Sequence, residues 1–501
     1  KIPKGMSFED NSYTRLLKEN LNIQVVYDWT ASTSDYDEKM SLCIGSNTIP
    51  EIMNVNATQY RALLKYDMIQ PLDKYFDDYA SDALKSYVKS GGEELQKCIT
   101  NEDGELMAIP APNLTAGGVN EMWIRQDWLD ALGLDVPRTW DELAEVAKAF
   151  VTRDPDGNGE NDTIGILGPG NSDHMNAVGG NQFGLDPLFS CFQSFPQYWL
   201  KSEDGSVEYG SIQPETKTAL ENISKLYADG VIDPETLVRS DSKEPLLAGK
   251  VGIFFGPWWC AYTFADATLS GSADWRAYFT PLSEDGKYYT HMAEPTTQYV
   301  VASKDCKNPE AAFKIINYIV ANEQKWVEEV VTSTEMGTGE FYPLYNTYDN
   351  ADEIEKSYEA LTKYLAGDIS MDDVDFSTHK LLKNDMEAVT KLKKKPYDDF
   401  SLKYWNLDSD LAKTNLPRLV AIMVGDAPLV NEEYVPVYNA YNGQTETMEA
   451  KWANLKKMEE ETFAKIIMGK ADISEFDTFV KNWKNQGGDQ ILKEINDELS
   501  K

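Results

Sequence analysis

Residues 122–150, MWIRQDWLDALGLDVPRTWDELAEVAKAF, and residues 151–165, VTRDPDGNGENDTIG, decide most of the fold. The first stretch predicts a strand, a helix, a turn and a second helix. Thr139 and Glu142 form a capping box at the start of that second helix, which an apolar stripe at helical spacing follows. The second stretch ends in a short strand bounded by glycines. Strands that alternate with helices are typical of an α/β domain.

The second stretch also contains a candidate calcium loop. Oxygen-bearing residues stand at every second position: Asp154, Asp156, Asn158, Glu160 and Asp162. This spacing matches positions 1, 3, 5, 7 and 9 of an EF-hand loop, with Gly159 at the sharp turn of position 6 and Glu160 ligating through its carbonyl. Position 12 is Gly165 rather than glutamate, so Asp162 is the candidate for the missing ligand.

The alternative interpretation of this loop is an acidic turn closed by its own side chains. Five alternating oxygen residues with a correctly placed glycine favour calcium over that alternative. The motif contains no acid or base positioned for chemistry. We therefore predict a structural Ca²⁺ that cross-links the loop.

Size and charge restrict the possible functions. A chain of 501 residues exceeds one ordinary domain, so two or more lobes are expected. The formal net charge is −36, which repels nucleic acid and anionic lipid. Five scattered cysteines without a CxxC motif argue against a disulfide framework and a structural zinc. Neither a signal peptide nor an apolar run of membrane-spanning length is present.

Apolar patterning predicts an α/β fold with a largely parallel sheet. The expected strands are residues 23–27, 50–55, 106–110, 163–167, 251–255 and 299–303. The expected helices include residues 8–20, 35–42, 59–65, 82–87, 215–229 and 308–320.

Aromatic residues carry the functional signal. Trp258 and Trp259 follow the buried strand 251–255, and ligands of α/β sheets bind beyond the carboxyl ends of the strands. Indole faces can stack on sugar rings there, although a core position is the alternative for any single Trp. The sequence contains none of the nucleophile-elbow, phosphate-loop, dinucleotide or zinc-protease motifs, so an enzyme is the minority interpretation.

Several segments together resemble a known family, the extracellular solute-binding proteins of ABC importers. The similarity is to the lipoprotein-type group that includes the alginate-oligosaccharide-binding proteins. It is carried by residues 123–129, 137–142, 154–162, 256–259, 465–469, 476–477 and 487–490. The chain departs from the family at its start, where the first strand and the lipidated cysteine are absent.

The resemblance implies a two-lobed α/β fold with a hinge and an interlobe cleft. The expected lobes are residues 1–112 with 299–400, and residues 113–298 with 401–501, the second carrying the calcium loop. The implied protein is not an enzyme. It is a monomer that captures an oligosaccharide by lobe closure and delivers it to an ABC permease. It would lie on the extracellular face of the membrane, held by a lipid anchor, or in the periplasm, and would bind no nucleic acid.

The predicted ligand contacts combine the Trp pair with polar and aromatic residues near the expected lobe crossings. They are Trp258, Trp259, Trp123, Tyr299, Asn113, Gln298, Asn56, Arg125 and Trp29. Net acidity favours a neutral glycan over a uronate polymer. Two alternatives remain open at this stage: a secreted, calcium-stabilised enzyme acting on glycans, and the same receptor fold with a peptide ligand.

Overall fold

The chain divides into two compact units in a computed structural model, and each is described by itself. Unit 1 consists of Lys1–Leu114 and Pro295–Asp352, and unit 2 of Thr115–Glu294 and Glu353–Lys501. The described residues are 4–32, 34–170, 182–264, 273–326, 341–376, 379, 381–390 and 410–500.

Unit 1 is built on a three-stranded sheet. Its central strand β10 (Thr296–Ala302) pairs with β1 (Ile52–Val55) on one side and with β2 (Ile109–Pro112) on the other, both antiparallel. Val55 lies opposite Tyr299. β10 is the segment that enters unit 1 from unit 2, and its last four residues are buried.

Helices surround this sheet in unit 1. They are α1 (Ser12–Leu21), α2 (Tyr36–Gly45), α3 (Ala57–Lys65), α4 (Asp73–Tyr79), α5 (Asp82–Ser90), α6 (Gly92–Ile99) and α13 (Glu310–Trp326). Their apolar faces form one core in which Leu17, Leu84 and Phe313 are fully buried. This burial supplies most of the stability of such a unit.

Unit 2 contains a four-stranded sheet of order β4-β7-β3-β8. The strands are β3 (Glu121–Arg125), β4 (Ile164–Ile166), β7 (Val251–Gly256) and β8 (Trp275–Tyr278). β4 runs parallel to β7, whereas β3 runs antiparallel to both of its neighbours. Every residue of β3 and β7 is buried, as expected for strands covered on both faces.

Two smaller pairings complete the strands of unit 2. β5 (Trp199–Lys201) and β6 (Val207–Tyr209) form an antiparallel hairpin. β9 (Tyr288–His291) runs parallel to β11 (Tyr434–Val437), so a strand far along the chain returns beside the first part of the unit.

The helices of unit 2 close its core. They are α7 (Gln126–Leu132), α8 (Trp140–Thr152), α9 (Asp186–Ser190), α10 (Pro214–Ala228), α11 (Lys243–Leu247), α16 (Glu353–Ala366), α17 (Leu382–Thr390), α18 (Asp410–Val420), α19 (Ala427–Asn431), α20 (Glu446–Ile467), α21 (Glu475–Trp483) and α22 (Asp489–Leu499). The short turns are η1 (Ala116–Gly118), η3 (Gly210–Ile212), η4 (Trp258–Cys260), η6 (Met371–Asp373), η8 (Ala421–Gly425) and η9 (Lys484–Gly488). The capping box predicted for Thr139 and Glu142 is present at α8.

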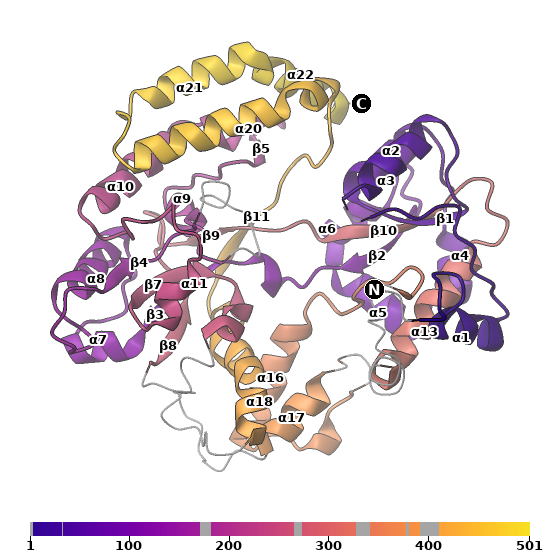
Figure 1. Cartoon of the computed structure of the whole chain (residues 1–501), viewed down its shortest axis with the longest axis horizontal. Helices are drawn as coiled ribbons and strands as arrows, with labels where there is room; N and C mark the ends of the chain where they lie inside the picture. Colours follow the sequence, from indigo (N-terminus) through magenta and orange to yellow (C-terminus); the bar gives the residue numbers. More distant parts are fainter. Residues whose placement is uncertain are drawn as a thin grey trace. The chain divides into compact units, whose positions relative to one another are not determined.

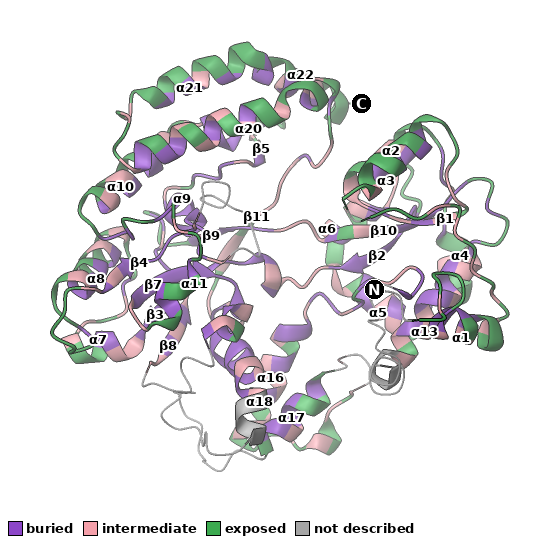
Figure 2. Ribbon diagram, in the orientation of Figure 1, coloured by how far each residue is buried: buried purple, intermediate pink, exposed green. Residues whose placement is uncertain are grey.

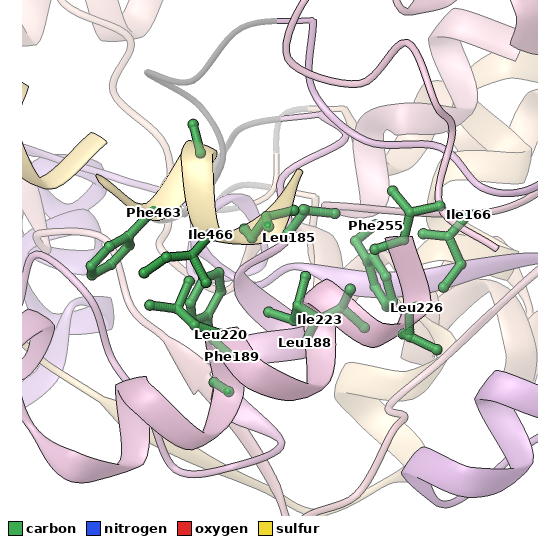
Figure 3. Close-up of a cluster of buried hydrophobic side chains, with 14 of the residues drawn as sticks. Ile166, Leu185, Leu188, Phe189, Leu220, Ile223, Leu226, Phe255, Phe463 and Ile466 are labelled. Carbon is green, nitrogen blue, oxygen red and sulfur yellow. The ribbon is translucent and has the colours of Figure 1, made fainter. Parts of the chain in front are cut away.

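The C-terminal helices add one wall of the unit 2 core. α20 and α21 lie side by side (Figure 1), and each has a buried and an exposed face (Figure 2). Phe463 and Ile466 of α20 lie close to Phe189 of α9 and Leu220 of α10 (Figure 3). The apolar residues Phe463 and Ile466 are therefore core positions.

Three expectations about the fold require correction. Residues 23–27 are not a strand but extended chain, with side chains alternately half-buried and exposed. The sheets are mostly antiparallel, because β10 and β3 run against the strands beside them. Alternation of strands with helices does not fix strand direction when a chain leaves one unit and returns to it.

The third correction concerns the last domain boundary. We expected residues 299–400 in the first lobe, but unit 1 ends at Asp352. α16 packs against α17, η8 and α19 inside unit 2, with Ile354 and Leu361 buried. The sequence between residues 322 and 410 is polar and weakly patterned, so it held no signal for this crossing.

None of the helices among the described residues is long and apolar enough to cross a membrane. The five cysteines are all free, and four of them are buried.

Candidate functional site

One edge of the unit 2 sheet gathers the ends of three strands. β4 ends at Ile166 and β7 ends at Gly256, while β3 begins at Glu121, which lies directly opposite Gly256. The carboxyl ends of β4 and β7 therefore meet the start of β3. This edge is where ligands of α/β sheets bind.

The Trp pair lies directly beyond this edge. Pro257 ends β7, and Trp258 and Trp259 form the turn η4. Trp258 is 5% exposed, and its indole Nε1 has no hydrogen-bond partner among the described residues. Trp259 is only partly buried. The structure thus keeps one indole accessible, as the sequence argument required, while their role as ligand contacts stays a prediction.

A cavity of about 540 Å³ opens at the same edge. Pro169 and Gly170, which follow β4, line it together with Gln182, Phe183 and the segment from Arg239 to Lys243. Gln182 donates to the Thr263 hydroxyl at 2.5 Å and also hydrogen-bonds Cys260 of η4, whose pKa burial raises well above its usual value. The cavity therefore adjoins the Trp turn, and its volume suits a small sugar ligand.

The helical turn η8 packs on the Trp turn from a distant part of the chain. η8 has π-helical geometry, which is rare and often occurs at functional sites. A Cβ atom at Gly425 would stand 2.6 Å from the carbonyl oxygen of Trp258 and 3.0 Å from the Trp123 ring. Only glycine permits this approach, which carries the next residue, Asp426, to the sheet edge.

Two buried carboxyl groups meet at this place. Glu121 and Asp426 are both fully buried, and none of their four carboxylate oxygens has a hydrogen-bond partner among the described residues. Burial raises the pKa of Glu121 well above its usual value, and the nearby Asp426 raises it further. Burial also raises the pKa of Asp426, followed by the charge of Glu355. Each unsatisfied buried polar group costs about 1–3 kcal/mol.

Sequence analysis missed both of these carboxyl groups. Glu121 opens a strand that is otherwise apolar apart from Arg125, and an acid in such a run was the available signal. Asp426 follows a stretch whose ordinary helical pattern gave no indication of the π turn.

Trp123 and Arg125 are corrected from ligand contacts to structural residues. Trp123 is fully buried, stacks on Phe254 at 6.1 Å and donates its indole N–H to the carbonyl of Gly256 at 3.3 Å. Arg125 is 5% exposed and forms a two-pronged ion pair with Asp127 at 2.6 and 2.8 Å.

The Arg125 guanidinium is held further by aromatic rings. It lies over the ring of Trp128 at 4.5 Å and near that of Trp275 at 5.8 Å. It also donates to the carbonyl of Gly249 at 3.3 Å. A guanidinium held by these partners is fixed in place and stabilises the core.

The predicted residues of unit 1 fall into two groups. Tyr299 is a core residue, 1% exposed and stacked on Tyr60 at 4.4 Å, which corrects its assignment as a ligand contact. Asn56 caps α3 by accepting the N–H of Gln59, and its amide donates to Asp37. Both polar ends of the Asn56 side chain are therefore occupied within unit 1.

The remaining three unit 1 residues are partly accessible. Asn113 and Gln298 are half-buried. Trp29 is half-buried too, with its ring 5.4 Å from that of Tyr36 and its indole N–H unpartnered among the described residues. Trp29 and Tyr36 thus form a small aromatic surface on this unit, and ligand contact by Trp29, Asn113 and Gln298 stays a prediction.

The candidate calcium loop is closed by its own side chains. Asp154 accepts the backbone N–H groups of Asn158 at 3.1 Å and Gly159 at 3.0 Å, and Gly159 has the positive φ of 81° that the sharp turn requires. The Asn158 amide donates to Asp156 at 2.9 Å and Asp162 at 3.3 Å. The oxygens of four predicted ligands are therefore held in one loop.

The donor set fits calcium in its chemistry. Burial raises the pKa of Asp156, and the adjacent Asp154 raises it further, so the loop carries uncompensated negative charge. Lys250 lies 2.8 Å from Asp162 and lowers the pKa of that carboxyl group. Among the described residues, no three His, Cys, Asp or Glu side chains are arranged to hold a metal. Binding would require Asp162 to turn from Lys250 into the loop.

A second buried polar cluster lies beside the sheet edge and was also missed. Asn120 donates to Asp186 at 2.8 Å, and His291 lies 3.9 Å from the same carboxyl group. Burial raises the pKa of Asp186 to about 7, partly opposed by the bond from Asn120, and lowers the pKa of His291 to about 3. Tyr288 donates to the carbonyl of Asn120. Asp186 is thus a partnered carboxyl group, unlike Glu121 and Asp426.

Comparison with known proteins identifies the family. The model of the bacterial extracellular solute-binding proteins matches residues 7–326, which is more than half of the chain. This chain belongs to that family. The resemblance inferred from the sequence and the two-unit α/β fold are therefore confirmed.

Two relatives in this solute-binding family have described ligands. The chain is 30% identical to the fructooligosaccharide ABC transporter substrate-binding protein FusA of Streptococcus pneumoniae over 246 residues, 46% of this chain and 43% of that protein. It is 24% identical to the polygalacturonan/rhamnogalacturonan-binding protein YtcQ of Bacillus subtilis over 469 residues, 91% of this chain and 82% of that protein. The match therefore spans less than half of FusA.

A solved structure agrees with the fold. The alginate-binding protein AlgQ2, solved without calcium ion, aligns with a TM-score of 0.55 and 15% sequence identity. The alignment covers 98% of this chain and 94% of that chain. At this identity the likeness shows that the fold is shared.

Proposed function

We propose that this protein is the substrate-binding component of an ABC transporter, and that it captures an oligosaccharide and delivers it to a membrane permease. The observation that carries the proposal is the partly exposed Trp259 at the carboxyl end of β7, next to a cavity of about 540 Å³. An accessible indole beside a concave surface is suited to stacking on a sugar ring. The names of FusA and YtcQ support a glycan ligand.

The proposed protein acts by binding rather than by catalysis. Lobe closure, a monomeric state and a lipid anchor at the extracellular membrane face belong to the same proposal. Small-angle scattering with and without ligand would report closure as a decrease in the radius of gyration. An unchanged radius at saturating ligand would contradict it.

Isothermal titration calorimetry with a panel of oligosaccharides tests the ligand class. We expect binding of at least one oligosaccharide. Trp259→Ala should lose about 10-fold or more in affinity, because stacking of a ring on an aromatic side chain contributes about 1–3 kcal/mol in comparable sites. Trp140→Ala is the comparison variant, since the Trp140 ring packs on Phe192 at 4.8 Å. Binding of peptides in place of sugars, or turnover of any sugar, would overturn the proposal.

Calcium is part of the proposal as a structural ion. Asp154, Asp156, Asn158 and Asp162 would hold it through side-chain oxygens, and Glu160 would contribute its carbonyl. When bound, the ion would cross-link the loop between α8 and β4. Chelation should then lower the melting temperature of the protein, and Asp154→Ala should remove that response.

Lys250 gives a sharper test of the same loop. Because its ammonium group holds Asp162 at 2.8 Å, Lys250→Met should free this carboxylate and raise the affinity for Ca²⁺. Lys225→Met is the control, because Lys225 is a solvent-exposed lysine on α10. Equal melting temperatures with calcium and with chelator in the wild type and in Lys250→Met would exclude the ion.

A further inference from the structure

The sheet edge of unit 2 carries five buried polar atoms without partners. Four are the carboxylate oxygens of Glu121 and Asp426, and the fifth is the indole Nε1 of Trp258. They come from β3, from the junction of η8 with α19, and from η4. Buried polar atoms almost always have partners, so this concentration indicates that solvent or a ligand completes the site.

Independent observations bring the three side chains together. Glu121 is paired with Gly256 in the β3–β7 register, two residues before Trp258. The backbone of Trp258 packs directly on Gly425, the residue before Asp426. Glu121 also acts electrostatically on Cys260 in the Trp turn. The two carboxyl groups are therefore positioned by the same close approach that seats Trp258.

The chemistry of the five atoms restricts what can occupy the site. Four acceptors and one donor complement a group that mainly donates hydrogen bonds and accepts one. Vicinal hydroxyl groups of a sugar ring do both. A uronate carboxylate has no proton to donate to these oxygens, and burying its charge in a water-poor site costs free energy.

A metal ion fits the same place poorly. No set of three His, Cys, Asp or Glu side chains arranged for a metal exists among the described residues, although Glu355 and Glu432 act electrostatically on the two buried acids. The indole N–H is a donor and cannot coordinate a cation. The occupant is thus an organic hydrogen-bond donor.

We infer that Glu121, Asp426 and the indole N–H of Trp258 form a specificity subsite for the hydroxyl groups of an uncharged sugar residue, and that this subsite rejects uronates. The inference rests on the proposed oligosaccharide function and deepens it by naming the ligand class. It assigns the discrimination between uncharged sugars and uronates to two acids that lie 305 residues apart in the chain.

The same geometry predicts that substitution of either acid raises the stability of the protein but lowers its affinity for the ligand. In Glu121→Gln and Asp426→Asn, a buried carboxyl group whose pKa is raised by burial becomes a neutral amide of similar size. The ligand-free protein should become more stable, whereas the ligand loses an acceptor. A purely structural role of either acid would produce no change in ligand affinity.

Calorimetry and thermal melting test this inference on the whole chain. The probes are neutral fructo- and gluco-oligosaccharides and oligogalacturonates. Each probe is titrated into the wild type, Glu121→Gln and Asp426→Asn. We expect the wild type to bind a neutral probe and to bind oligogalacturonate at least about 10-fold more weakly. Each variant should weaken the neutral probe by about 10-fold, as expected when one hydrogen bond to the ligand is lost. Each should also raise the melting temperature without ligand by about 2 °C or more.

Glu433→Gln provides the matched control, because Glu433 is an exposed acid of the same unit and its substitution removes the same charge. It should change neither affinity nor melting temperature. If one variant fails to fold, circular dichroism identifies it and the other still decides the outcome.

The outcomes separate this inference from the proposed function. Two results would overturn the subsite and leave the receptor function standing. One is equal affinity of the wild type for uronates and neutral sugars. The other is an unchanged affinity of both variants for the neutral sugar while Trp259→Ala loses this affinity. Failure of the wild type to bind any glycan overturns both. A gain in relative uronate affinity in the variants supports the subsite, since the amide N–H groups of Gln and Asn can donate to a carboxylate.

Discussion

Asp186→Asn should remove the pH dependence of stability that one buried acid imposes on unit 2. Asp186 is 2% exposed, and burial raises its pKa from 3.8 to about 7. Its carboxyl group accepts a hydrogen bond from the side-chain amide of Asn120 at 2.8 Å. At pH 5 the folded protein therefore keeps this carboxyl group protonated, whereas the unfolded chain ionises it.

The size of the effect follows from the two pKa values. A raised pKa in the folded state adds stability below the unfolded pKa, and this stability is lost as the pH rises through the folded pKa. The window here runs from about pH 3.8 to about pH 7, or roughly three units. At about 1.36 kcal/mol per unit, the wild type loses about 4 kcal/mol across it relative to the variant.

Denaturant unfolding between pH 3.5 and 8 measures this difference. Tryptophan fluorescence suits it, because most of the tryptophans lie in unit 2. The free energy of unfolding of the wild type minus that of Asp186→Asn should fall by about 4 kcal/mol across the window and be flat above pH 8. Subtraction also cancels the groups that lie far from Asp186 and titrate in both proteins.

The matched control for this measurement is Asp135→Asn, since Asp135 is exposed and lies in the same unit. Its difference curve should stay close to zero. A flat curve for Asp186→Asn would refute the reasoning, because it would mean that burial does not keep this carboxyl group protonated in the folded protein.

Three further predictions concern packing. Gly425→Ala should cost about 1–3 kcal/mol of unfolding free energy and weaken ligand binding, because its Cβ would stand 2.6 Å from the Trp258 carbonyl oxygen. Gly45→Ala is the control: a Cβ atom there meets open space, so thermal melts and ligand titrations should show no change. Glu459→Ala should destabilise unit 2 by about 2–4 kcal/mol in denaturant unfolding, since the buried hydroxyl of Tyr209 loses its acceptor at 2.8 Å. Arg125→Lys should lower stability by about 1–3 kcal/mol but leave ligand affinity unchanged in calorimetry, and a loss of affinity would restore Arg125 as a ligand contact.

Local patterning predicted the helices best. The capping box at Thr139 indicates the start of a helix from a few neighbouring residues. Residues 251–255 were recognised as a buried strand because the run is continuously apolar. Information of this kind needs no knowledge of distant segments.

The direction of strands and the assignment of residues 353–390 were beyond local reasoning. β10 lies antiparallel between β1 and β2 because the chain enters unit 1 from another unit, and no residue within β10 encodes that entry. The same limit applies to α16, whose partners η8 and α19 lie more than fifty residues further along the chain.

The candidate site was predicted in part, for the same reason. The strand-end rule located Trp258 and Trp259, but it also selected Trp123, which lies inside β3 with both faces of the sheet covered. A strand buried on both faces gives no alternation from which to read the orientation of a side chain. Glu121 and Asp426 become neighbours only through the close contact at Gly425, which is a tertiary feature.

The two kinds of buried acid at this edge should therefore behave differently. Asp186 has a partner within the protein, so its stability cost is a property of the fold, and Asp186→Asn should alter the pH dependence of unfolding without changing ligand affinity. Glu121 and Asp426 have no such partner among the described residues, so their cost should be relieved by ligand. Measuring both quantities in all three variants distinguishes these cases, because a shared structural role would move stability alone at every one of the three positions.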